Sequence, residues 1–449
     1  MVARASVKMP KNQQGLALLV LVIFMMLAFA SYMFSELSID QVKVDQKKQT
    51  AIALKKAKQA LIAYAVNFPE ISPANRGPGY LLCPDTVNDG FAQTACNGGG
   101  IVTIGRLPWR TLNVGDLRDG ANERLWYAVS ENFDNRNTPF RPSPPYPANT
   151  PKVLNTETIG NITVRDQTNT IIYDGTTIDA AVAVIIAPGE TLTRDDGVIQ
   201  DRSAANVNTE INYLDIHVAS GEDNASSLQG ALGGAVNDGF IQGEIKNGAG
   251  DVIVNDQIIV ITYGEIMEQV RKRVSREISN VINNYFATCN DYPEAAVFDS
   301  TGVGPFNSVA LSQQGVLPVD TALPVDWNTN CANGITLPPW IRGEDWHLNT
   351  HYQYSYTKED PSAIPPVMAA NCIQGAAIPP AVTCLTVNNT DLPIDDKRAL
   401  IVFAGRVIAG QDRVTLPVVM SDRFENENNN GDLVFDAAET EDYVWVIAP

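Results

Sequence analysis

The feature that most constrains this chain is a run of 53 residues without a helix breaker. Neither Gly nor Pro occurs from Leu16 to Phe68, although the 449-residue chain contains 32 Gly and 27 Pro. Residues 16–34 carry no charge and as a helix would extend about 28 Å, close to one hydrocarbon thickness. We therefore predict one long helix in which residues 16–36 cross a membrane.

The second half of the run is patterned differently. Apolar residues recur there at steps of three and four, as on one face of a helix; they are Leu54, Ala57, Leu61, Tyr64 and Phe68. Lysines fall mostly off this stripe. This pattern predicts an amphipathic helix that packs against a globular body.

The apolar segment could instead be a buried core helix or a secretory signal peptide, but both interpretations fit less well. Few soluble core helices are apolar on every face for five turns. A secretory signal peptide has a shorter apolar core that ends in a small-residue cleavage site. Ala28-Phe29-Ala30 offers such a site only weakly, and the helical pattern continues far beyond it.

Charge and cysteine content restrict the class of protein. With 32 Lys and Arg against 51 Asp and Glu, the net charge is −19, which argues against nucleic acid as a partner. All six cysteines follow the apolar segment, and an even set in loop-rich sequence is typical of an oxidising compartment. The sequence thus predicts a single-pass membrane protein whose C-terminal body lies in a bacterial periplasm or outside the cell.

The N-terminal organisation resembles the type IV pilin and type II secretion pseudopilin family. The residues concerned are a short basic leader (1–15) ending in Gly15, an apolar segment starting at Leu16, and the helix that continues to Phe68. The resemblance implies cleavage between Gly15 and Leu16 by a prepilin peptidase, followed by methylation of the new N-terminus. It also implies that other pilins or pseudopilins are partners through this helix.

Two positions depart from the family pattern. The first mature residue is usually Phe or Met but here is Leu16, and the fifth is usually Glu but here is Val20. Subunits without that Glu resemble the large K-type minor pseudopilin, which has no subunit above it. The resemblance therefore implies a subunit at the tip of a filament or one that initiates it.

The rest of the chain shows the same order of elements twice. In residues 37–264 and again in 265–449, a helix is followed by a cysteine-bearing loop, an LPW-type turn and strand-like segments; the turns are LPWRTL (107–112) and LPPWIR (337–342). The strings GYLLCPDT and ERLWYAVS in the first part also resemble pilin-like proteins. We expect an α+β fold: a long pilin-like helix with a membrane-embedded first half, then two tandem pilin-like modules of a helix and an antiparallel sheet. Coincidence of a common helix-then-strand order is the alternative.

The duplication also suggests how the cysteines pair. Cys83 with Cys96, and Cys289 with Cys331, would each lie between a helix and an LPW turn, which leaves Cys372 with Cys384. Fifteen pairings are possible in principle.

An acidic segment near the C-terminus resembles a calcium loop. Oxygen ligands at alternating positions around a glycine are typical of such loops, and the candidates are Asn426, Asn428, Asn430, Asp432, Asp436 and Glu439. The EF-hand pattern fails at its first and twelfth positions, which are Asn426 and Ala437. Calcium is the one cofactor that the sequence suggests, with Asp85, Asn88 and Asp89 a weaker candidate site and a solvated acidic loop the alternative.

Nothing in the sequence favours catalysis. No nucleophile elbow, phosphate-binding loop or dinucleotide motif occurs in a suitable context. His347 and His351 are four apart but lack the Glu of a zinc-protease motif, so we expect a structural pair. The predicted function is a membrane-anchored minor pilin or pseudopilin, not an enzyme. The alternatives are a tip-displayed adhesin or ligand-binding protein, and a signal-anchored periplasmic binding protein outside any filament.

Overall fold

The structure is a computed structural model. It describes residues 13–71, 76–94, 96, 102–135, 153–226, 239–289, 292–298, 304, 306–307, 309, 312–319, 335–355, 384–389, 397–413, 418–429, 434–438 and 441–448. The helices of this part are α1 (Gln13–Val66), α2 (Phe68–Ile71), α3 (Tyr263–Cys289) and α4 (Pro339–Gly343). Short 3-10 turns are η1 (Ala204–Asn206), η2 (Glu210–Asn212), η4 (Trp346–Asn349), η5 (Met420–Asp422) and η6 (Asn426–Asn429).

Two four-stranded antiparallel sheets form the body. The first has the order β1-β2-β5-β11, with strands Val102–Arg106, Trp126–Ser130, Ala183–Ala187 and Gln257–Ile261. The second has the order β12-β13-β15-β17, with strands Gln314–Val316, Thr350–Tyr354, Ala399–Phe403 and Tyr443–Ala448. In both sheets the strands lie side by side in the order in which they occur along the chain.

Small sheets complete each part. Beside the first sheet lie β4-β3-β8 (Ile171–Tyr173, Val164–Arg165, Phe240–Ile241), β6-β7 (Ile216–His217, Glu222–Asp223) and β10-β9 (Val252–Val254, Ile245–Lys246). In the second half of the chain, β14 (Thr386–Asn388) pairs in parallel with β16 (Val434–Asp436).

One hydrophobic core connects the helices with both sheets. It includes Leu61 of α1, Val274 of α3, Tyr127 and Ile185 of the first sheet, and Ile401 of the second. The opposite face of each sheet has its own buried cluster, around Trp126 and Phe240 in the first sheet and around Val402 and Phe424 in the second. Both sheets are therefore covered on two faces.

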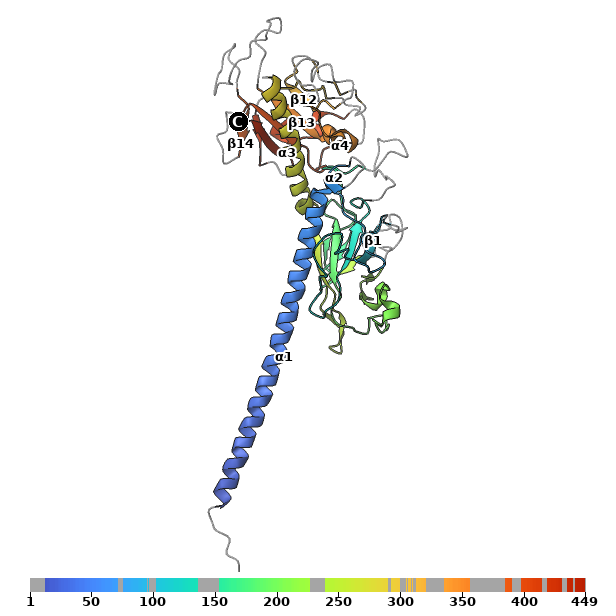
Figure 1. Ribbon diagram of the computed structural model, residues 1–449, viewed down its shortest axis with the longest axis vertical. Coiled ribbons are helices and arrows are strands. Elements are labelled where there is room, and N and C mark those ends of the chain that lie inside the picture. Colours follow the sequence, from blue (N-terminus) through green and yellow to red (C-terminus); the bar gives the residue numbers. More distant parts are fainter. Residues whose placement is uncertain are drawn as a thin grey trace, which may run out of the picture.

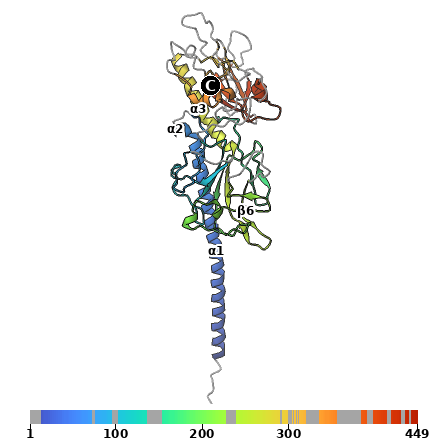
Figure 2. The same ribbon diagram turned by 90° about the vertical axis from the view of Figure 1, so that its right-hand side faces the viewer.

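The helices are arranged end to end. α1 extends out of the body as a rod, and α3 lies beyond its C-terminal end beside the second sheet (Figures 1 and 2). The apolar stripe expected on the second half of α1 is buried at Leu54, Ala57, Leu61 and Phe68, and Tyr64 packs against the same core. The helix expected at the start of the part 265–449 is α3, and its residues Ile266, Val270, Val274 and Ile278 are fully buried.

The expected fold class and location are wrong in their membrane part. In the described portion of the chain, no helix is long and apolar enough to cross a membrane. The membrane-embedded segment 16–36 and the single-pass inner-membrane location with a periplasmic body are therefore not supported. The described chain is α+β.

Candidate functional site

The most unusual surface of the molecule is an uncovered apolar stretch of α1. All residues from Leu18 to Phe29 are exposed, and none carries a charge. Leu18, Phe24 and Met26 each expose about two thirds of their surface (66%, 67% and 67%). Large exposed apolar patches on folded proteins mark interaction sites. We call residues 18–29 the apolar segment.

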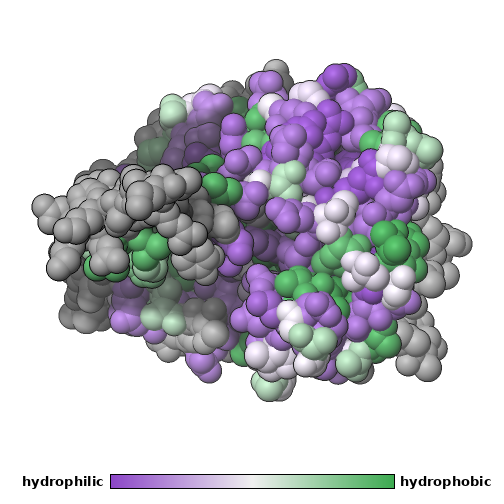
Figure 3. Space-filling view, turned by 90° about the horizontal axis from the view of Figure 1, so that it is seen from below, coloured by the Kyte–Doolittle hydropathy of each residue, from purple (hydrophilic) through white to green (hydrophobic). Residues whose placement is uncertain are grey.

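The body surface around the rod is different in character. Seen from the free end of α1, it is mostly hydrophilic, with separate hydrophobic patches (Figure 3). The apolar segment is thus a continuous hydrophobic surface held away from a polar body by a rigid helix. Its sequence explains the rigidity, because no Gly or Pro interrupts the backbone ladder between residues 16 and 68.

The body holds α1 firmly where the two first meet. Gln49 Nε2 donates to the Asp119 carbonyl at 2.8 Å, and the Gly120 amide donates to Thr50 Oγ1 at 2.9 Å. Gly120 has to be glycine, because a Cβ there would lie 2.3 Å from the Gln46 carbonyl oxygen. The helix direction is therefore fixed at the edge of the body.

A second polar contact joins α1 to α3. Lys58 Nζ donates to the Val260 carbonyl at 2.7 Å and forms an ion pair with Glu265 at the start of α3. Glu265 also accepts from the Thr262 amide at 3.0 Å. The pKa of Glu265 is lowered: burial raises it, but the hydrogen bonds from Lys58 and Thr262 and the lysine charge outweigh burial.

The predicted cleavage site falls at the start of α1. Gly15 and Leu16 lie within its first turn, and their side chains are outside the described set. Val20, which replaces the usual Glu of the resembling family, lies in the apolar segment with 43% of its surface exposed. Cleavage itself stays a prediction.

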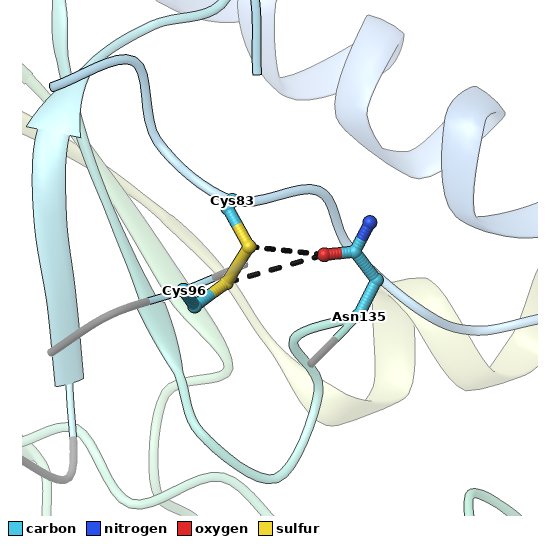
Figure 4. Close-up of a disulfide and its surroundings, with 3 residues drawn as sticks. All are labelled: Cys83, Cys96 and Asn135. Carbon is cyan, nitrogen blue, oxygen red and sulfur yellow. Dashed lines mark hydrogen bonds between the residues drawn. A yellow bond between two sulfur atoms is a disulfide. The ribbon is translucent and has the colours of Figure 1, made fainter. Parts of the chain in front are cut away.

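The structure joins Cys83 to Cys96 by a disulfide, with 5.1 Å between the two Cα atoms. Asn135 Oδ1 lies 3.0 Å from Cys83 Sγ and 4.0 Å from Cys96 Sγ (Figure 4). A disulfide sulfur has no proton to donate, so these are close contacts between the loop and the segment that follows β2. Cys289 and Cys384 are also disulfide-bonded, whereas Cys331 and Cys372, their expected partners, lie outside the described residues.

The predicted calcium ligands are only partly described. Asn428 is buried and uses its amide internally: its Oδ1 accepts from the Asp436 amide at 2.9 Å, and its Nδ2 donates to Asp442 Oδ2 at 3.2 Å. Asp436 accepts from Asn389 Nδ2 at 2.7 Å, and Asn426 lies at the start of η6. Asn430, Asp432 and Glu439 lie outside the described residues, so calcium binding here stays a prediction.

The weaker calcium candidate is a closed turn. Both carboxylate oxygens of Asp85 accept backbone amides, from Val87 at 3.0 Å, Asn88 at 2.7 Å and Gly90 at 2.6 Å. Asp89 Oδ1 accepts from the Phe91 amide at 2.9 Å. The acidic and amide residues of this loop shape its backbone.

The two histidines are buried in separate settings. His347 belongs to η4 with its ring 4.6 Å from that of Phe306, and His351 is in β13, 5.8 Å from the ring of Phe424. Burial lowers the pKa of His347 to about 3 and also lowers the pKa of His351. Both rings are therefore neutral at pH 7, as expected of a structural pair.

A charged contact that was not predicted from the sequence joins the two halves of the body. Glu157, from the segment before β3, reaches Arg413 at 3.2 Å and Arg423 at 3.5 Å, and both arginines are buried in the second half. The second half also contributes an acid to the contact: Glu344 accepts hydrogen bonds from Tyr80 Oη and from the Leu154 amide of the first half, each at 2.8 Å. These residues are far apart in sequence, and no local pattern indicates their meeting.

A buried pair of acids was also missed. The Asp215 amide donates to Asp256 Oδ2 at 2.8 Å, and the Asp256 amide donates to Asp215 Oδ2 at 3.2 Å. Burial raises the pKa of Asp215 to about 7, and burial together with the Asp215 charge raises that of Asp256 well above its usual value. Gln200 and Asn224 donate to the same carboxylates at 2.8 Å. The pair organises loops rather than facing solvent.

These buried acids do not form a metal site. Among the described residues, no group of three or more His, Cys, Asp or Glu side chains could hold a metal ion. No protein-family model matches the chain, and neither the curated proteins nor the solved structures contain a match. The surface that most needs explanation is therefore the apolar segment.

Proposed function

We propose that this chain is a minor pilin or pseudopilin, a subunit that joins a type IV pilus or a type II secretion-like filament through the first half of α1. The observation that carries the proposal is the apolar segment, fully exposed on a rigid helix that the body leaves uncovered. Apolar surface of this extent is stable in water only when another surface covers it. Equivalent helices of neighbouring subunits would cover it on all sides.

The amphipathic second half of α1 supports this assignment of roles. The same helix that offers the apolar segment is anchored in the body by Leu54, Ala57 and Leu61. A force on the exposed half is thereby passed to a packed core rather than to a loop. Such a construction suits a subunit whose helix assembles while its body is displayed.

A tip or initiating position is part of the proposal. Val20 stands where the resembling family usually has Glu, so it supplies no carboxylate that could pair with the N-terminal amine of a neighbouring subunit. The second sheet and α3 add a large mass beyond the end of α1 (Figure 1), where a further stacked subunit would need space. Both features favour a subunit at the tip of a filament or in the complex that initiates it.

Leader processing tests the proposed function. The full-length chain is expressed with and without a prepilin peptidase, and the N-terminal sequence and mass are measured. We expect a mature chain that begins at Leu16 and carries one added methyl group, only when the peptidase is present. A Gly15→Val variant should stay uncut. A wild-type chain that still begins at Met1, in cells whose peptidase cuts its own pilins, would contradict the proposal.

A further inference from the structure

Charge is distributed very unevenly along this chain. Residues 1–58 contain nine of the 32 basic residues and three of the 51 acids. The remaining residues therefore hold 23 basic and 48 acidic side chains, a net charge of −25 against +6 for the N-terminal part. The basic part of the molecule is thus almost confined to α1 and the residues before it.

The positive charge is concentrated where α1 enters the body. Five lysines there are exposed and form no ion pair with the described residues; they are Lys43, Lys47, Lys48, Lys55 and Lys56. We call these five residues the basic neck. Asp45 is the one acid between residues 41 and 58, and it accepts a hydrogen bond from Gln41.

An acidic surface lies at the same end of the body. The described residues 190–226 and 239–251 contain ten acids, of which Asp215 and Glu222 are buried, and three basic residues. Two of those basic residues, Arg194 and Arg202, are mainly buried and already face the acids Asp223 and Glu123. Glu190, Asp201 and Asp251 are exposed and form no ion pair with the described residues.

Hydrogen bonds connect the acidic loops to the neck. Gln49 of α1 bonds to Asp119, whose Oδ2 accepts the Gly189 amide at 2.9 Å, and Glu190 follows directly. Arg202 Nη1 donates to the Gly189 carbonyl at 2.7 Å, which places Asp201 close by. The basic neck and the acidic loops therefore lie at the same height along α1, beside each other.

We propose that the basic neck binds the acidic loops (190–226 and 239–251) of a second copy of this chain, in a parallel dimer with a two-fold axis along α1. Two patches at one height on the same molecule can match each other reciprocally across such an axis, as an isologous interface requires. The same axis brings the two apolar segments side by side. The inference rests on the proposed role of α1 in assembly and adds the identity of a first partner.

The choice of a second copy follows from charge complementarity. Opposite patches steer association and fix the register of an interface. The strength of the attraction depends on ionic strength, because the screening length falls from about 30 Å at 0.01 M salt to about 3 Å at 1 M. In a parallel dimer, the basic neck of each copy faces the acidic loops of the other. In an antiparallel dimer, the two basic necks would lie at opposite ends of the dimer, away from the acidic loops of the other copy.

Zero-length cross-linking of the full-length protein tests this arrangement. Unlabelled and 15N-labelled copies are mixed and treated with a carbodiimide, which joins a lysine directly to a carboxylate. Mass spectrometry then separates links between copies from links within one. We expect links between the neck lysines and acids of the acidic loops in the other copy, with a yield at least fivefold lower at 0.5 M than at 0.05 M salt.

Charge reversal provides the decisive controls. A neck variant (Lys47→Glu, Lys48→Glu, Lys55→Glu, Lys56→Glu) should lose these links, and so should a loop variant (Glu190→Lys, Asp201→Lys, Asp251→Lys). Mixing the two variants should restore them, now between neck glutamates and loop lysines. Reversal of Lys272, which is ion-paired with Glu268 on the surface of α3, should leave the yield unchanged.

Several results would overturn the inference. They are links only within one copy, links between copies that survive neck reversal, and neck links only to other proteins. The proposed function is tested separately, because cleavage after Gly15 requires neither the neck nor a second copy. A chain that is processed but shows no neck links would refute the dimer alone.

Discussion

Both halves of α1 are helical, but the body covers the apolar side chains of the second half and leaves those of the first half exposed. From Ala53 to Phe68, the apolar residues lie on one stripe and are covered by both sheets and α3. From Leu18 to Phe29, apolar residues lie on all sides and are covered by nothing in the described structure. The chain's own fold covers the first stretch, and the second is left exposed by the part of the chain that the structure describes.

This difference explains why apolar content alone does not identify a core. Leu61 and Leu21 are the same residue type in the same helix, yet the exposed surface is 0% for Leu61 and 54% for Leu21. What separates them is the pattern of their neighbours, since polar residues return around Leu61 but not around Leu21. Stability should therefore depend on the second half of α1, and assembly on the first.

The largest effect should come from truncating the covered half. Leu61→Ala removes a fully buried side chain and should lower the free energy of unfolding by about 2–5 kcal/mol. Leu21→Ala removes an equal volume from an exposed position and should change it by less than about 0.5 kcal/mol. Chemical denaturation of both variants measures the contrast. Equal effects on stability would mean that the apolar segment is part of the core after all.

Removal of the Cys83–Cys96 disulfide should have the next largest effect. The bond closes a short loop, 13 residues in sequence, and a loop of this size contributes about 3 kcal/mol in the chain-entropy description. The double variant Cys83→Ser/Cys96→Ser should lose stability of that order without changing the apolar segment. A variant that keeps its melting temperature would show that packing alone holds this loop in the covered body.

The contact of Glu157 with two buried arginines tests whether the covered body acts as one unit. Glu157→Gln would leave Arg413 and Arg423 without their carboxylate across the two halves, at an expected cost of about 1–3 kcal/mol. The exposed Asp179, 3.5 Å from Arg406, gives a matched control, because Asp179→Asn should cost less than about 0.5 kcal/mol. Limited proteolysis that releases one half of the Glu157→Gln variant would support the expectation, and equal behaviour of the two variants would refute it.

The buried acids of the body predict a smaller dependence on pH. Burial raises the folded-state pKa of both Asp215 and Asp256. The contribution of Asp215 to stability is therefore fully present below about pH 4 and is lost as the pH rises through about 7, and Asp256 contributes in the same direction. Arg194 and Arg202 face Asp215 and oppose this shift. His347 acts in the other direction, since its stability is present above its usual pKa and is lost as the pH falls toward 3.

Because the two contributions oppose each other, a variant is needed to separate them. Asp256→Asn keeps the size of the side chain but removes its titration. The variant should gain melting temperature relative to wild type at pH 8 compared with pH 5, by about 2–4 °C for each kcal/mol. Parallel curves for the variant and the wild type over this range would exclude the pair as a source of pH dependence.

Local patterns predicted much of this structure. The apolar stripe on the second half of α1 follows from short-range spacing, and the pairing of Cys83 with Cys96 was expected from the repeated order of elements. The described helix segment did not support the predicted membrane crossing, because hydrophobicity alone does not say what covers an apolar helix. Contacts such as Glu157 with Arg413, and Asp215 with Asp256, depend on tertiary placement and leave no mark in the local sequence.

The central claim is that equivalent helices of other filament subunits cover the apolar segment. A photo-reactive amino acid at Leu21 tests it, with the same substitution at Val297, which is exposed in the second half of the body, as a control. We predict that the Leu21 probe cross-links to the N-terminal apolar helix of another filament subunit and that the Val297 probe does not. No link from Leu21 to such a helix, in cells that make the filament, would contradict the account.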